Sequence, residues 1–197
     1  NPLVVYYSYS GITRRLAEDS IVIPAQVTMI GQSVRAFAAL LQVTLPDGLV
    51  SIGSYAFSGC EFDHIAIPES VTSIGSGAFF ACNNLAHITM PECVTLIGGQ
   101  TFAHCGFLRS ITLPRGVTRI GAEAFTDCRC LKDVTIPSGV LEIGESAFKG
   151  CDEPTLTVTK GSFAEEHARQ NNIPYKLGAA ILIMAKSGQK SAVMIDE

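Results

Sequence analysis

Cysteine is the residue type in this sequence whose spacing could most readily support chemistry. The chain has seven cysteines, and five of them recur 22 or 23 residues apart: Cys60, Cys82, Cys105, Cys128 and Cys151. A ladder of thiols could bind a metal or form disulfides. Alternatively, each cysteine is a small buried side chain at a corner of a repeat, and its S–H donates to a backbone carbonyl. We favour the second interpretation, because the repeat explains the spacing and buried structural thiols are inert.

The two remaining cysteines, Cys93 and Cys130, lie outside this spacing. Cys128 and Cys130 are separated by one residue, whereas zinc and redox sites typically use C-x-x-C. In an oxidising compartment, the odd number of cysteines would leave at least one thiol unpaired.

A pair of histidines forms the second candidate site. His64 and His87 each lie four residues before a proline. If those segments are adjacent strands, the two rings are neighbours ~5 Å apart. With Asp63 or Asp133, the pair could bind a transition metal, but a structural zinc site normally takes four ligands. We favour two solvated side chains on the sheet over a metal site, and we predict no metal.

Motifs that are typical of catalysis are absent from the sequence. It contains no G-x-S-x-G, no H-E-x-x-H and no phosphate-binding G-x-x-x-x-G-K-[ST]. His104 and Cys105 are neighbours in the sequence, but successive side chains of an extended segment point apart. Glu165 and Glu166 are interpreted as the solvated start of a helix, where negative charge is favourable. We therefore predict that the chain is not an enzyme.

An internal repeat positions the cysteine column and the histidine pair. Residues three and one before each repeated proline are apolar with a polar residue between them, which predicts a strand with one buried face. The proline ends the strand because it has no N–H for the ladder. Apolar residues three and six positions later return to the core, and a glycine follows that is expected at positive φ. An Ala-Phe pair then inserts a ring from the opposite wall. The repeated prolines are Pro24, Pro46, Pro68, Pro91, Pro114 and Pro137.

One repeat cannot cover its own apolar face, but stacked repeats can. Strand stacking advances ~4.8 Å per coil, so five or six coils give a core roughly 25–30 Å long. The predicted fold class is an α/β repeat solenoid. It has parallel strands, irregular or short helical connections and a helical C-terminal cap.

The unit I-P-x-x-V-x-x-I-G-x-x-A-F-x-x-C resembles the BspA-like leucine-rich repeats of bacterial surface antigens. The resemblance covers about residues 21–175. It implies a cell-surface or secreted bacterial protein that takes part in adhesion, and a protein or glycan as its binding partner.

Two outward-facing columns of the predicted strands form the candidate contact surface. They lie four and two residues before each proline, and they are flat, weakly charged and rich in hydroxyls. Repeat scaffolds usually bind partners on the sheet face, although a threonine column also simply suits an exposed β surface. We name this surface the binding strip, and it consists of Gln42, Thr44, His64, His87, Thr89, Ser110, Thr112, Asp133 and Thr135.

The first 20 residues differ from the repeat. A strand at 3–7, a hydroxyl-rich loop and a helix start resemble the opening of flavodoxins. The resemblance implies an FMN-binding protein as the alternative function, with the phosphate held by Ser8, Ser10, Gly11 and Thr13. A flavodoxin needs roughly 140 residues, whereas the match covers only residues 3–18. We therefore predict no cofactor, and the segment could instead be a strand that caps the solenoid.

After a solenoid over residues 21–158, a C-terminal cap is predicted at 159–177. Ser162 and Glu165 have the spacing of a capping box, which predicts a helix over 162–171. Residues 178–197 form a strand-rich tail, a possible hairpin that could pair with residues 3–7.

Composition excludes several classes of function. The net charge is −4, which gives no electrostatic reason to expect nucleic-acid binding. No run of ~18 apolar residues exists, so no membrane-spanning helix is predicted. Hydrophobic residues make up 47% of the chain and charged residues 16%, which indicates a buried core rather than disorder.

Overall fold

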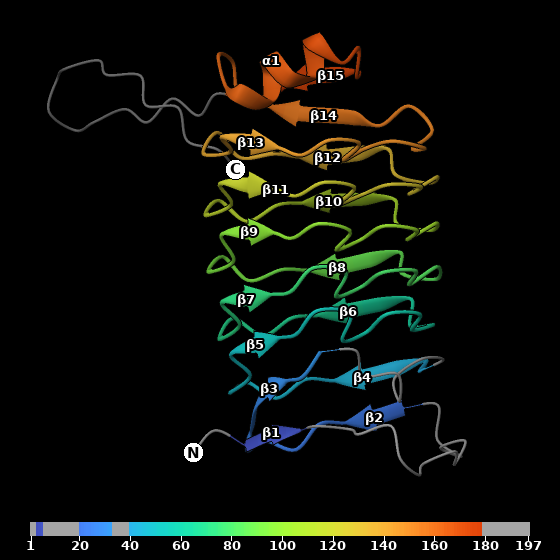
Figure 1. The fold of residues 1–197 in the computed structure, drawn as a ribbon, viewed down its shortest axis with the longest axis vertical. Coiled ribbons are helices and arrows are strands. Elements are labelled where there is room, and N and C mark those ends of the chain that lie inside the picture. Colours follow the sequence, from blue (N-terminus) through green and yellow to red (C-terminus); the bar gives the residue numbers. More distant parts are fainter. Residues whose placement is uncertain (1–2, 6–19, 33–39, 179–197) are drawn as a thin grey trace, which may run out of the picture.

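The computed structural model describes residues 3–5, 20–32 and 40–178 of the 197-residue chain. Figure 1 shows the described chain as an elongated stack of coils, with two rows of short strands running up the stack. Every strand pairing in the described part of the chain is parallel. The coils are those of the predicted solenoid.

The first row of strands lies just before the repeated prolines, as the alternation of apolar residues predicts. Strands that are hydrogen-bonded to each other in this row share one register, so that Ile65 pairs with Ile88 and Ile111 with Val134. We call this row the first sheet. It contains β2 (Ser20–Val22), β4 (Gln42–Thr44), β6 (His64–Ala66), β8 (His87–Thr89), β10 (Ser110–Thr112), β12 (Asp133–Thr135), β14 (Thr155–Val158) and β15 (Tyr175–Leu177). Its hydrogen-bonded ladder is interrupted between β4 and β6 and between β8 and β10, and its last two strands, β14 and β15, lie beyond the last repeated proline.

A second row of strands forms where the chain turns back after each proline. The turn is tight: the N–H of Val117, for example, donates to the carbonyl of Pro114 at 3.0 Å. The sequence predicted a return to the core here, but not a strand. We call this row the second sheet. It contains β1 (Leu3–Val5), β3 (Val27–Ile30), β5 (Ser51–Ile52), β7 (Ser73–Ile74), β9 (Leu96–Ile97), β11 (Arg119–Ile120) and β13 (Glu142–Ile143).

Each coil continues after its strand of the second sheet into a third segment, which we call the third wall. It carries the repeated phenylalanine. These rings stack along the axis of the solenoid, with centroids 5.4–5.7 Å apart and nearly parallel planes. The column therefore confirms the predicted insertion of one ring per coil into the core. Its members are Phe57, Phe79, Phe102, Phe125 and Phe148.

Backbone hydrogen bonds of the third wall all run in one direction. In four successive coils, three alternate N–H groups donate to carbonyls of the next coil toward the C-terminus. Phe102 donates to Ala124 at 2.8 Å, and His104 donates to Thr126 at 2.7 Å. This regularity needs a residue at positive φ on either side of the phenylalanine, such as Gln100 (58°) and His104 (62°).

The prediction of positive φ at the repeated glycine was wrong. None of Gly53, Gly75, Gly98, Gly121 and Gly144 has positive φ. The glycine is needed because the coils approach closely at this point. A Cβ on Gly121 would lie 2.4 Å from the backbone nitrogen of Gly99. Space between coils, rather than backbone conformation, therefore explains the glycine column.

The predicted helix is present as α1 (Phe163–Gln170). The side chain of Ser162 accepts from the N–H of Glu165 at 3.2 Å, as a helix N-cap does. Two alanines, Ala164 and Ala168, face the core and are buried. Figure 1 shows α1 at the end of the stack, next to β14.

Several predictions concern residues outside the described part of the chain. They include the proposed phosphate contacts of Ser8, Ser10, Gly11 and Thr13, and the hairpin in the tail from residue 179 onward. The strand expected near the N-terminus is present as β1, which pairs in parallel with β3. Among the described residues, no helix is long and apolar enough to cross a membrane.

Candidate functional site

The binding strip lies on the outward face of the first sheet. Neighbouring residues of a strand point to opposite faces. The side chains of Ile65, Ile111 and Val134 therefore enter the core, and those on either side of them point outward. Eight of the nine strip residues are exposed, and Thr135 is half-buried. The strands β4, β6, β8, β10 and β12 thus present the strip as one continuous surface.

The two histidines of the strip are neighbours across β6 and β8, as predicted. His64 pairs in register with His87, and its Nδ1 lies 2.6 Å from Oδ1 of Asp63. The hydrogen bond from the His64 ring lowers the pKa of Asp63, so this carboxylate is charged at neutral pH. Among the described residues, no three side chains of His, Cys, Asp or Glu gather as ligands for a metal ion.

Asp133, at the far end of the strip, is paired with a cation. Its Oδ1 accepts from Nζ of Lys176 at 2.8 Å, which links β12 to the final strand, β15. Both side chains are more than half exposed. An exposed pair of this kind contributes at most about 1 kcal/mol to stability, so its main effect is to offset the negative charge of Asp133.

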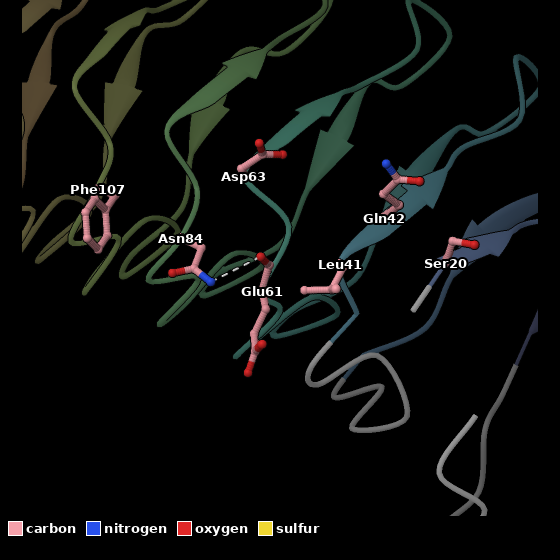
Figure 2. Close-up of a pocket in the computed structure, with 7 residues that line it drawn as sticks. All are labelled: Ser20, Leu41, Gln42, Glu61, Asp63, Asn84 and Phe107. Carbon is pink, nitrogen blue, oxygen red and sulfur yellow. Dashed lines mark hydrogen bonds between the residues drawn. The ribbon is translucent and has the colours of Figure 1, made fainter. Parts of the chain in front are cut away.

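An open groove adjoins the strip at its other end. Its volume is about 820 Å³, and Figure 2 shows Ser20 at one end and Phe107 at the other, with Glu61 and Asp63 between them. Gln42 belongs to both the groove and the strip. The residues that line the groove are Ser20, Leu41, Gln42, Glu61, Asp63, Asn84 and Phe107.

Most of the groove was missed by the sequence analysis, which had singled out only Gln42 and Asp63. A signal was nevertheless present in the repeat. Glu61, Asn84 and Phe107 each lie seven residues before a repeated proline, so they occupy equivalent places in consecutive coils.

The cysteine column is structural, as we expected from its spacing. In four of the five cysteines the S–H donates to the carbonyl of a phenylalanine in the preceding coil: Cys82 to Phe57 at 3.0 Å, and Cys105 to Phe79 at 3.2 Å. Cys128 and Cys151 repeat the contact at 3.0 and 3.1 Å. Burial raises the pKa of the Cys105 thiol well above its ordinary value. The pKa values of the Cys60 and Cys128 thiols are also raised, so these three buried cysteines have little nucleophilic thiolate at neutral pH.

This arrangement predicts which thiols react. Cys93 and Cys130 are exposed, whereas Cys60, Cys82, Cys105 and Cys128 are buried. With Ellman's reagent at neutral pH, we expect the two exposed thiols to react within minutes and the four buried ones only after denaturant is added. The half-buried Cys151 should react at an intermediate rate. Loss of the fast phase in the double variant Cys93→Ser/Cys130→Ser would support the assignment, and rapid reaction of more than three thiols in the wild type would contradict it.

Solved bacterial proteins share this fold. A leucine-rich cell surface protein from Faecalibacterium prausnitzii is 29% identical with a TM-score of 0.59, over 82% of this chain and 52% of that one. A leucine-rich repeat protein of T. pallidum is 30% identical with a TM-score of 0.55, over 71% and 58%. A leucine-rich repeat protein from Bacteroides ovatus, 24% identical with a TM-score of 0.58 over 83% and 49%, shows the fold alone. The chain thus spans about half the length of these structures.

No curated protein matches the sequence. The model of the BspA-type leucine-rich repeat region, in contrast, matches six copies across residues 28–157. This range is more than half of the chain, and it contains most of the strands, the phenylalanine column and the cysteine column described above. The chain therefore belongs to the BspA-type leucine-rich repeat family.

Proposed function

We propose that this chain is a non-enzymatic binding module of a bacterial cell-surface or secreted protein, and that it recognises a protein or glycan through the binding strip. The observation that carries the proposal is the strip itself: nine polar side chains from five strands on one sheet face. Membership of a family of repeat scaffolds supports it. The similarity to a cell surface protein of F. prausnitzii supports the location.

The rigidity of the first sheet supports recognition at the strip. Parallel strands in register hold successive side chains ~4.8 Å apart, and the buried residues between them fix each strand to the core. Thr112, for example, follows the buried Ile111, whose strand pairs in register with that of Val134, and Thr89 follows the half-buried Ile88, whose strand pairs in register with that of Ile65. A surface that is already ordered loses little conformational entropy on binding, so more of the interaction energy appears as affinity.

A pair of charge-introducing substitutions tests the strip. We expect Thr89→Glu/Thr112→Glu to weaken binding at least about tenfold, because two new carboxylates in the contact surface must be desolvated or repelled. Binding would be measured by biolayer interferometry against immobilised collagen, laminin and fibronectin, and on a glycan array.

The matched control is Thr72→Glu/Thr95→Glu, which places the same charges beside strands of the second sheet, where both threonines are exposed. This variant should bind as the wild type does. Equal losses in the two variants would place the binding surface elsewhere, and an unchanged affinity of the strip variant would reject the proposed function.

A further inference from the structure

The groove beside the strip carries a concentration of hydrogen-bond acceptors. Glu61 and Asp63 contribute carboxylates, and no ion pair of the described residues involves Glu61. Asn84 donates through Nδ2 to the backbone carbonyl of Glu61 at 3.3 Å, which leaves its Oδ1 as a further acceptor (Figure 2). A ligand that is rich in donors would therefore complement these three side chains.

The charge of the surrounding coils reinforces this preference. Between residues 40 and 108 the sequence contains five acidic residues and neither lysine nor arginine; the acids are Asp47, Glu61, Asp63, Glu69 and Glu92. The next basic residue is Arg109, just beyond Phe107. The negative potential is therefore centred on Glu61 and Asp63, and it ends at the Phe107 side of the groove.

Apolar side chains stand at two points along the groove. Phe107 is 55% exposed and Leu41 is 42% exposed, although both are large hydrophobic residues. An exposed aromatic ring at the end of a groove is typical of an anchor point in protein recognition. The apolar contact at Phe107 is separate from the acidic centre.

The length of the groove suits a short extended peptide. It runs from Ser20 on β2, past β4, β6 and β8, to Phe107 just before β10. Four strand spacings correspond to roughly 19 Å. An extended polypeptide spans this length with about six residues.

We propose that the groove binds an extended protein segment in which lysine or arginine is followed by an apolar residue. The basic side chains lie over Glu61 and Asp63, and the apolar one packs on Phe107. This inference rests on the proposed function. The groove and the binding strip share Gln42, and the inference names the kind of partner that this end of the strip binds. The excess of negative charge favours a cationic peptide over a neutral glycan, which would leave the Glu61 carboxylate without a counter-charge and Asp63 with His64 as its partner.

Fluorescence anisotropy with two labelled hexapeptides tests the proposal. The probe Gly-Lys-Arg-Gly-Leu-Gly should bind the full chain, and Gly-Glu-Glu-Gly-Leu-Gly should not. We expect Glu61→Gln/Asp63→Asn to weaken binding of the basic probe at least about tenfold, since both charged contacts are lost. Phe107→Ala should weaken it about fivefold with an unchanged dependence on salt, because only apolar contact is removed.

The matched control is Asp47→Asn/Glu69→Gln, which removes the same charge from exposed residues outside the groove. It should change the affinity less than about threefold. Equal losses in the two double variants would show that net charge, not the groove, attracts the peptide. Absence of peptide binding, or binding of a neutral oligosaccharide that Glu61→Gln/Asp63→Asn abolishes, would also overturn the inference. If the strip substitutions still abolish binding to matrix proteins in that case, the proposed function stands and only the groove assignment fails.

Discussion

Replacement of Phe102 by alanine is expected to lower the free energy of unfolding by about 3–5 kcal/mol. The Phe102 side chain is fully buried, with 0% of its surface exposed. Its ring stacks between those of Phe79, at 5.5 Å, and Phe125, at 5.4 Å. Alanine would leave a cavity within the column that the backbone cannot close, because Phe102 and its neighbours are bonded to the coils on each side.

Urea denaturation followed by circular dichroism would measure this change. Phe107→Ala is the matched control, because it removes the same ring from an exposed position, and it should cost less than about 1 kcal/mol. Similar losses in the two variants would mean that the stacked column contributes no more to stability than a surface ring does.

The second large effect is expected at the glycine column. Gly121→Ala should destabilise the protein by about 3 kcal/mol or more. The new Cβ would lie 2.4 Å from the nitrogen of Gly99 and 2.7 Å from the carbonyl carbon of Gly98. Both are backbone atoms, so no side-chain rotation relieves the overlap, and the two coils must separate.

Two further glycine-to-alanine variants make this test quantitative in thermal denaturation. At Gly98 the closest atom is the side-chain Oγ of Ser76, at 2.9 Å, so part of the overlap can be relieved and the loss should be smaller. At Gly139 the closest atom is the carbonyl oxygen of Val117, at 3.6 Å, which is an ordinary contact. Gly139→Ala should therefore be neutral or slightly stabilising, because alanine reduces the entropy of the unfolded chain. Equal melting temperatures for the variants at Gly121 and Gly139 would contradict the close approach of the coils.

The repeat made the strands of the first sheet and the core predictable. Period-two alternation around residues such as Ile65 and Ile67 fixes which face is buried, and the recurrence of the unit fixes which strands are neighbours. The pairing of His64 with His87 and the S–H contact of Cys105 followed from the same logic. Equivalent positions in a repeat occupy equivalent environments, so one inference about a column applies to each of its members.

Features that depend on the distance between coils were not predictable in the same way. The sequence shows that Gly121 is required, but a glycine tolerates both positive φ and close contact, and only the structure distinguishes the two causes. The second sheet was missed because strands of two residues, such as β11 (Arg119–Ile120), are too short for alternation to be visible. The groove was missed because Glu61, Asn84 and Phe107 differ in chemistry, so their column does not appear as a pattern.

The one-directional bonding of the third wall has an electrical consequence. Each peptide unit carries a dipole of ≈ 3.5 D, and those of Phe102, His104 and their equivalents all point along the axis of the solenoid. Their N–H ends face the C-terminal coils, so these dipoles add within the third wall. The N–H groups of Gly121 and Gly144, beside the second sheet, donate instead to the preceding coil, and their dipoles oppose those of the third wall. The backbone therefore gives the solenoid little net field, and the acidic residues between 40 and 108, in the N-terminal half, set the direction from which a cationic molecule approaches.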